Sequence, residues 1–434
     1  MIKLNKIFSN KYTQFIFLLY FVGIFLLSRT FIGFYVFGFR IGEFSMLLSL
    51  IIFIFSIFQF KSEIFRKNLD LNFFIACFFL LLTFVIFVTF NGSFSNLYSY
   101  KSSTYIWSIG YLFLGMIFAE FTNFKFRTIY IFLFINLFIY FYSIFGITDD
   151  LQNILLQYTD KFEYHKGSDL VIMFTSVIYL MNRLLTNKNK SFEVFLVFSS
   201  LYLPLMLFKS RSGFAAFVVF LIIEFLYLKK DTKLDAKRLI PLLIICFFIL
   251  LQSLFIVNKT GVVEVEQITN NVESLVEKRK VPLNIKGVEV EKAFLFIENN
   301  RIFSGDGNLN WRLQIWQDVF FDLIEEGKLL TGFNFNNKFD AMDDPYRSGN
   351  DGTNENVHNF LVNVLGRGGL IHLFLYIYIF SLLFKSLISK HNFYFLSFPI
   401  AVVITSLFDA SMENAHFPLI FYFVTGIVIN LKKL

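Results

Sequence analysis

The sequence predicts an all-α membrane protein with about twelve transmembrane helices and one large, partly helical polar loop. Three observations support this fold class. Of the 434 residues, 56% are hydrophobic and only 16% are charged, whereas about a quarter of the residues in a soluble protein are charged. The mean hydropathy is +0.62. Apolar runs long enough to cross a bilayer recur along the chain, and one polar stretch of about a hundred residues interrupts them.

The apolar runs, of about 17 to 25 residues each, divide the chain into three parts. We expect nine transmembrane helices in residues 1–257, a large loop at residues 258–356 and three helices in residues 357–434. The first run follows three lysines but lacks a small-residue cleavage site, so it is predicted to remain as a helix. The predicted spans are 12–28, 41–60, 71–90, 103–120, 128–147, 168–185, 191–208, 211–228, 239–257, 357–384, 393–409 and 413–430.

The distribution of Lys and Arg predicts the orientation in the membrane. The two termini and one set of alternating short connections carry twenty of these residues, and the opposite set carries seven. Because basic residues near transmembrane ends favour the cytoplasm, both termini are predicted to be cytoplasmic and the loop 258–356 external. The net charge of +7 reflects this asymmetry and not a nucleic-acid partner, since the loop itself holds seventeen acidic and eleven basic residues.

The sequence predicts no metal site and no cofactor. Glu355 and His358 have an i, i+3 spacing that metal sites use, but no further His or Cys lies near them. Both cysteines fall inside apolar runs, so neither a disulfide nor a reactive thiol is expected. There is no glycine-rich phosphate loop and no nucleophile elbow. The acidic pairs Asp149-Asp150 and Asp343-Asp344 leave binding of a divalent ion open as an alternative.

Within the loop, residues 310–329 are predicted to form an amphipathic helix, because apolar residues recur there at the i, i+4, i+5 and i+8 positions. Residues 261–298 have weaker periodicity and are expected to be partly helical. On a helical wheel Arg312 points into the apolar stripe, whereas Asp318 lies toward the other face. Arg312 is therefore expected either to reach water or a nearby carboxylate, or to bind an anion.

A short turn at residues 209–213 places two cations at the predicted outer membrane surface. Ser210 or Ser212 can cap the helix that follows, and the N-terminus of that helix adds positive potential beside Lys209 and Arg211. Two cations next to a helix N-terminus suit a phosphate group. The alternative is that both cations anchor the turn at the membrane interface by snorkelling.

His358 marks the point where the polar loop becomes apolar again, with Asn356 as the predicted N-cap of the next helix. A helix N-terminus disfavours imidazolium, so the ring is expected to be neutral and able to accept a proton. His358 is thus a candidate general base for a sugar hydroxyl. The alternative is a structural histidine at the interface.

These signals, in this order, resemble motifs of the bacterial O-antigen polymerase and O-antigen ligase superfamily, the Wzy and WaaL proteins. Residues 210–213 look like the family's Ser-Arg-Gly-type turn, and 311–316 with 330–333 resemble its Arg-x-x-x-Trp element and trailing glycine. His358-Asn359 followed by Gly369-Leu370 resembles its His-Asn helix start and Gly-Leu element. His372 departs from the pattern where a second glycine is usual, as does Arg367 where a small polar or acidic residue is common.

The resemblance implies a metal-independent, inverting glycosyltransferase at the periplasmic face of the bacterial inner membrane. By position, Arg211 and Arg312 would bind the diphosphate leaving group, and His358 would deprotonate the acceptor hydroxyl. The implied partners are an undecaprenyl-diphosphate-linked oligosaccharide donor and acceptor and membrane lipid. A chain-length regulator is a further candidate partner, and nucleic acid is not expected.

Three activities are compatible with these features. A polymerase, which adds a glycan chain to a new lipid-linked repeat, is favoured because the chain is strongly aromatic and idiosyncratic. A ligase, which transfers the finished glycan to a lipid A core, is the first alternative. A lipid-oligosaccharide flippase or transporter is ranked lower because ionisable residues within the predicted helices are few and most lie near helix ends, among them Glu43, Asp169, Glu193, Glu224 and Arg367.

Overall fold

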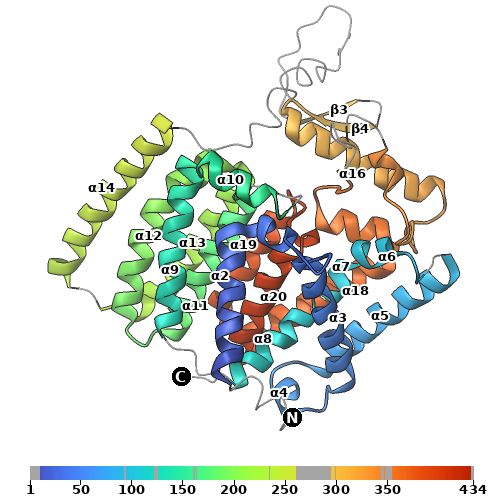
Figure 1. The fold of residues 1–434 in the computed structure, drawn as a ribbon, viewed down its shortest axis with the longest axis horizontal. Helices are drawn as coiled ribbons and strands as arrows, with labels where there is room; N and C mark the ends of the chain where they lie inside the picture. Colours follow the sequence, from blue (N-terminus) through green and yellow to red (C-terminus); the bar gives the residue numbers. More distant parts are fainter. Residues whose placement is uncertain are drawn as a thin grey trace, which may run out of the picture. The chain divides into compact units, whose positions relative to one another are not determined.

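The computed structural model describes residues 10–91, 94–121, 126–159, 162, 164–233, 235–260, 295–298, 300–343, 347 and 354–431. These residues are mostly helical, with two short β-hairpins (Figure 1). Nine of the described helical segments are long and apolar enough to span a bilayer. The structure therefore confirms the predicted all-α fold class of a multi-pass membrane protein.

The helices follow the predicted spans, with differences at their ends. The nine long spans are α2 (Lys11–Gly33), α3 (Ile41–Phe58), α5 (Leu71–Asn91), α7 with α8 (Thr104–Trp107 and Gly110–Phe121), α9 (Phe126–Phe145), α12 (Lys188–Lys209), α13 (Arg211–Asp231), α14 (Ala236–Thr260) and α18 (Phe360–Lys390). The predicted span at 168–185 corresponds to α11 (Gly167–Leu184), which has 18 residues like α3, and those at 393–409 and 413–430 correspond to the shorter helices α19 (Ser397–Ser406) and α20 (His416–Ile429).

The remaining elements are short, apart from one amphipathic helix. They are β1 (Tyr35–Val36), β2 (Phe39–Arg40), α4 (Glu63–Arg66), α6 (Leu97–Ser102), α10 (Asp149–Leu156), β3 (Leu295–Glu298), β4 (Arg301–Ser304), α16 (Gly307–Glu325) and the 3-10 turns η1 (Asp340–Met342), η2 (Phe393–Leu396) and η3 (Ser411–Glu413).

Contacts divide the chain into two compact units that do not follow sequence order. Helices α5 and α18 each contribute residues to both units. Unit 1 comprises Met1–Phe78, Thr104–Val263 and Tyr378–Leu434, and unit 2 comprises Phe79–Ser103 and Glu264–Ile377.

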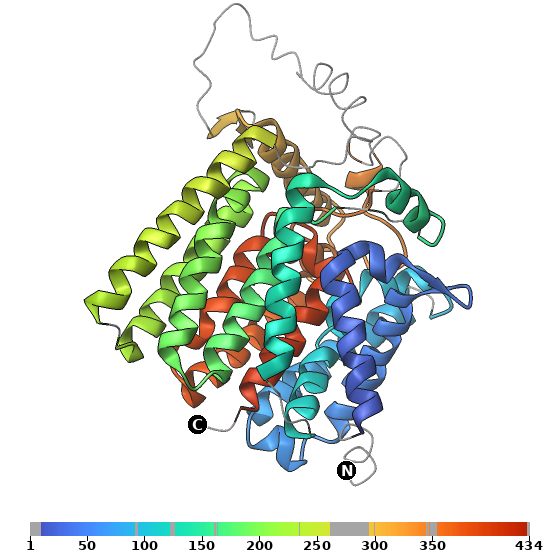
Figure 2. The ribbon, with the colours of Figure 1, turned by 60° about the vertical axis from the view of Figure 1, so that its left-hand side comes forward.

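Unit 1 is a helical bundle in which α8 packs along α20, and α12 lies between α13 and α14 (Figure 2). Two glycines set the spacing of α8 and α20. A Cβ on Gly115 would lie 2.1 Å from the carbonyl oxygen of Phe423, and a Cβ on Gly426 would lie 2.1 Å from that of Leu112. Small residues allow this approach, which provides van der Waals contact where lipid leaves little hydrophobic drive between helices.

Unit 2 is organised around the amphipathic helix α16, and this helix confirms the one predicted at 310–329. It begins three residues earlier than predicted, because the Asp306 side chain caps it by accepting a hydrogen bond from the Leu309 amide at 2.9 Å. Its apolar face joins a buried cluster that we call the α16 core, consisting of Ile315, Val319, Leu323, Phe339, Ala341, Met342 and Val357.

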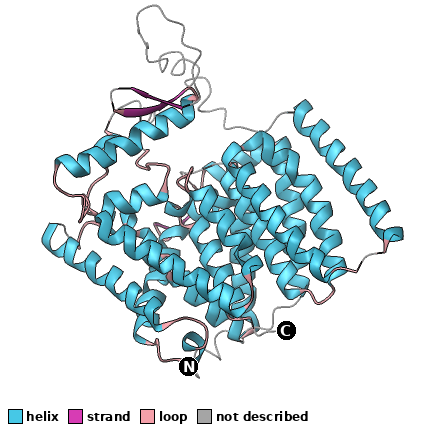
Figure 3. Cartoon of the chain, turned by 180° about the vertical axis from the view of Figure 1, so that it is seen from behind, coloured by secondary structure: helices cyan, strands magenta, loops and turns pink. Residues whose placement is uncertain are grey.

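The antiparallel hairpin β3–β4 lies against α16 and was not predicted (Figure 3). The Ile302 amide donates to Gln317 Oε1 at 2.7 Å, which ties the edge of the hairpin to the helix. Of the stretch 261–298 that was expected to be partly helical, residues 261–294 lie outside the described residues. The last four residues form strand β3 and are therefore not helical.

A break in α18 holds the segment that follows α16. Gly369 has φ 63° and ψ −164°, a conformation that is almost restricted to glycine. The break leaves backbone amides without helical partners, and Leu370 N–H donates to the Leu329 carbonyl at 2.9 Å. A Cβ on Gly369 would lie 2.2 Å from the Leu330 oxygen, and one on Gly332 would lie 2.5 Å from the Arg367 carbonyl. Both glycines are therefore required for close backbone approach.

Candidate functional site

His358 lies in a bend directly before α18, with a positive φ of 54°. This conformation is uncommon for a residue with a side chain and points to a functional constraint or to local strain. The prediction that Asn356 is the N-cap of this helix is wrong. Asn359 caps the helix instead, because its Oδ1 accepts hydrogen bonds from the amides of Leu361 at 3.0 Å and Val362 at 3.2 Å. The helix accordingly begins at Phe360 and not at the predicted residue 357.

Two tryptophans of α16 hold the segment that carries His358. The Trp311 ring meets the His358 ring edge-on, with centroids 5.0 Å apart and an interplanar angle of 65°. Trp316 Nε1 donates a hydrogen bond of 2.7 Å to the carbonyl of Val357, whose side chain is buried in the α16 core. This packing role was not predicted. No local spacing signals it, because residues five apart lie about 140° apart around a helix.

Arg312 follows Trp311 on α16 and is half-buried. It lies one turn before Ile315, a member of the α16 core. The structure therefore packs the stretch of helix that carries Arg312 against the segment that carries His358. A cation and an imidazole carried by two segments in contact could together bind an anionic leaving group and accept a proton.

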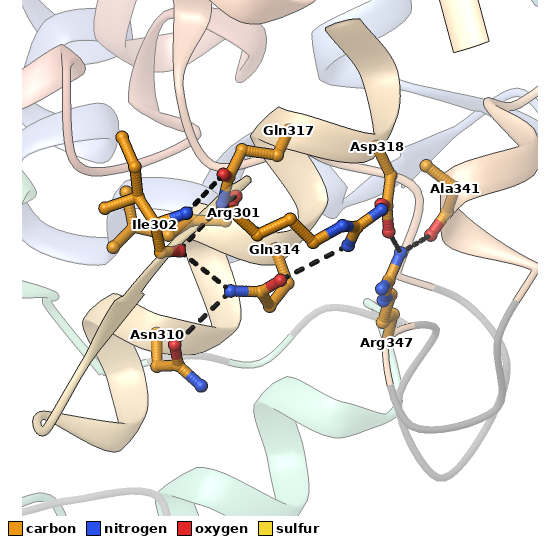
Figure 4. Close-up of polar contacts among 9 residues, drawn as sticks. Arg301, Ile302, Asn310, Gln314, Gln317, Asp318, Ala341 and Arg347 are labelled. Carbon is orange, nitrogen blue, oxygen red and sulfur yellow. Dashed lines mark hydrogen bonds and ion pairs between the residues drawn. The ribbon is translucent and has the colours of Figure 1, made fainter. Parts of the chain in front are cut away.

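The carboxylate of Asp318 is paired with two other arginines (Figure 4). Arg347 Nη1 lies 2.5 Å from Asp318 Oδ2 and donates to the Ala341 carbonyl at 3.0 Å. Arg301 also donates to Asp318, and it contacts Gln314 Oε1 at 3.3 Å. These pairs link the hairpin and residue 347 to the polar side of α16, which fits the predicted position of Asp318.

Glu355, which the sequence analysis considered as a metal ligand, forms an ion pair with a lysine. Lys101 Nζ of α6 lies 2.5 Å from Glu355 Oε2. Burial raises the pKa of the neighbouring Tyr98 hydroxyl, an effect that the positive charge of Arg367 opposes. Arg367 donates to that hydroxyl at 3.0 Å, and its guanidinium stacks 4.0 Å from the centre of the Phe339 ring. Arg367, one of the departures from the family pattern, therefore packs inside unit 2.

Of the two predicted caps of α13, Ser210 and Ser212, the structure of unit 1 shows Ser210. The Gly213 amide donates to Ser210 Oγ at 3.1 Å, and Arg211 is the exposed first residue of the helix. A Cβ on Gly167, the first residue of α11, would lie 2.3 Å from the Cβ of Ser210, so the two helix starts are in direct contact. Arg211 belongs to unit 1, whereas Arg312 and His358 belong to unit 2.

Among the described residues, no group of three or more His, Cys, Asp and Glu side chains could hold a metal ion. Asp149 and Asp150 form the first turn of α10. Asp343 pairs with Lys338 at 2.6 Å, and Asp344 lies outside the described residues.

Comparison with known proteins finds one matching family model. The family model described as O-antigen ligase matches residues 194–377, a range that includes Arg211, Arg312 and His358. No curated protein matches the chain significantly. The family match confirms the resemblance that the motifs indicated. The match supports a relationship of residues 194–377 to the O-antigen polymerase and ligase superfamily, which includes glycosyl-transferring enzymes.

Proposed function

We propose that the protein is a polysaccharide polymerase of the periplasmic membrane face. It transfers an undecaprenyl-diphosphate-linked glycan chain onto a new lipid-linked repeat unit, in O-antigen or capsule synthesis. The observation that carries the proposal is the contact between Trp311 and His358, which joins the Arg312 helix to a histidine held in a left-handed conformation. The match to the O-antigen ligase family supports the reaction class.

The proposed reaction is a single displacement. The acceptor hydroxyl oxygen attacks the anomeric carbon of the donor sugar as the bond from that carbon to the diphosphate oxygen breaks. His358 accepts the hydroxyl proton, and the undecaprenyl diphosphate leaves with the electron pair. Attack from the side opposite the leaving group inverts the anomeric configuration.

Arg312 stabilises the negative charge that develops on the leaving diphosphate. A guanidinium provides two parallel N–H donors that match phosphate oxygens, and such a bond is stronger where water is partly excluded. The half-buried position of Arg312 beside the α16 core meets that condition. The assignment of Arg211 to the diphosphate is a separate prediction, based on the motif and on the capped N-terminus of α13.

The proposal includes independence from metal ions, because the guanidinium group supplies the charge that a divalent ion supplies in other glycosyltransferases. The test is transfer activity of purified protein after treatment with EDTA. Activity is expected to be unchanged. Loss with EDTA and recovery with a divalent ion would assign the charge-stabilising role to a metal.

The family description favours a second candidate, the O-antigen ligase. Gene deletion in the native host distinguishes the two activities, with surface lipopolysaccharide resolved on a gel and lipid-linked intermediates measured in parallel. A polymerase defect leaves a core that carries a single repeat and no ladder. A bare core, with long glycan accumulating on the lipid carrier, would instead establish the ligase.

A further inference from the structure

A buried polar cluster joins three helices of unit 1. Asp169, in the first turn of α11, accepts a hydrogen bond of 2.8 Å at Oδ1 from His416 Nε2, at the start of α20. Ser28 Oγ of α2 lies 3.2 Å from the same nitrogen, at a kink where Ser28 has φ 48°. All three side chains are buried. Ionisable residues inside a membrane bundle are candidates for a functional role, because their burial is costly.

The same first turn of α11 contacts the cap of the Arg211 helix. Gly167 lies two residues before Asp169, and its backbone is so close to Ser210 that an added Cβ would be 2.3 Å from the Ser210 Cβ. Ser210 in turn accepts the Gly213 amide and thereby sets the direction in which α13 begins. A rotation of the first turn of α11 would therefore displace Ser210 and, with it, the adjacent Arg211.

Hydrogen bonds oppose that rotation. Asp169 Oδ2 accepts the Lys166 amide at 3.3 Å, which closes the turn on itself, and Ser168 Oγ donates to Asp409. The bonds of Asp169 to His416 and of Ser168 to Asp409 connect the turn by side chains to segments far away in the sequence. A buried polar pair contributes little net stability, since desolvation offsets the attraction, but its hydrogen bond is directional. The pair is suited to setting an orientation.

We propose that Asp169 and His416 are positioning residues that hold the first turn of α11, and through Ser210 hold Arg211, in the orientation that binds a diphosphate. The inference rests on the proposed function, in which Arg211 is a diphosphate ligand. It assigns a role to two residues outside the Arg211, Arg312 and His358 set. It also explains why a charged residue of α11 is buried against α20.

The test measures binding of undecaprenyl diphosphate to purified full-length protein in detergent. His416→Leu removes the donor to Asp169 and is expected to raise the Kd on the order of tenfold, about the effect of one charge-assisted hydrogen bond. His416→Gln keeps an N–H donor and is expected to restore most of the affinity. Gly167→Ala displaces Ser210 but keeps both Asp169 and His416, and it is expected to weaken binding similarly.

The matched control is Glu224→Gln. Glu224 forms a buried pair of 2.6 Å with Arg183, which lies in the last turn of the same helix α11. The Glu224→Gln substitution disrupts a buried pair that lies away from Ser210. It is therefore expected to lower thermal stability and to leave the Kd for undecaprenyl diphosphate unchanged. A Kd raised equally by Glu224→Gln would overturn the positioning role, because it would reflect general damage to the bundle.

A double variant separates this inference from the proposed function. In an Arg211→Ala background, His416→Leu is expected to have no further effect on the Kd, because the pair acts through Arg211. Additive losses would overturn the inference and leave the proposed function intact. Full affinity of the single Arg211→Ala variant would overturn the diphosphate assignment of Arg211, and the inference with it. Wild-type affinity of folded His416→Leu would refute the positioning role alone.

Discussion

The two candidate regions are held in place by different forces. In unit 1, Arg211 is presented by a helix start that is fixed by a serine cap, a close glycine contact and the buried Asp169–His416 pair. In unit 2, Arg312 and His358 are held by the α16 core and by two tryptophans. Helices within a bilayer gain little from burying apolar surface against one another, so polar bonds and close contacts select their orientation. The amphipathic α16 buries one face by the ordinary hydrophobic effect.

The function of the two regions is therefore expected to be sensitive to different substitutions. Loss of a directional bond is expected to matter most in unit 1. Loss of an aromatic contact or of apolar volume is expected to matter most in unit 2.

The largest expected effect is at His358. His358→Ala removes the proposed base, and transfer is expected to fall on the order of a hundredfold to ten-thousandfold, the usual contribution of general base catalysis. Glycan length in the deletion host and the amount of protein in the membrane are measured together. His391→Ala is the control, because His391 stacks on Phe395 in unit 1. Normal glycan length in the His358 variant would remove the general-base role and leave the residue purely structural.

Arg312→Lys tests whether the cation in unit 2 acts through its geometry. Lysine keeps the charge but cannot donate two parallel bonds, so kcat/KM is expected to fall roughly tenfold or more. Arg301→Lys is the matched control, since Arg301 of β4 pairs with Asp318 on the polar side of α16. Equal losses in both variants would show that the effect is structural.

Trp316→Phe tests the aromatic support of His358. The substitution removes the bond from Nε1 to the Val357 carbonyl and is expected to cost about 1 kcal/mol of local stability. We expect kcat to fall severalfold while the KM for the donor changes little. Trp107→Phe, in α7 of unit 1, is the control for loss of an indole. An unchanged kcat for Trp316→Phe would argue against support of His358 by α16.

The smallest expected effect is a pH dependence of thermal stability that arises from His165 in unit 1. Burial lowers the pKa of His165, whose Nε2 lies 2.9 Å from the Phe25 carbonyl. The unfolded chain therefore binds a proton near pH 6.5 that the folded protein excludes, so stability is complete above that pH and decreases as pH falls through it. Thermal unfolding in detergent is expected at a lower temperature at pH 5.5 than at pH 7.5. His165→Gln should reduce this difference, and an undiminished difference would assign it to another group.

The local parts of the site were predictable from the sequence. The spacing of apolar residues predicted α16, and the serine before Arg211 predicted the cap of α13. These features depend on residues within a few positions of one another. The cap at Asn359 was missed because Asn356 and Asn359 are both capable of the role, and the left-handed conformation of His358 selects between them. The hairpin β3–β4 was missed because its strands have only four residues each.

The sequence by itself determined that the protein crosses the membrane repeatedly, because the thickness of a bilayer sets the length of each apolar run. It also determined which residue types were available for phosphate binding and proton transfer. Only the tertiary structure decided that Asp169 bonds to His416 and that Trp311 meets His358. The physical reason is that these contacts join positions 247 and 47 residues apart. Their formation depends on how whole helices pack, which no local spacing of residues encodes.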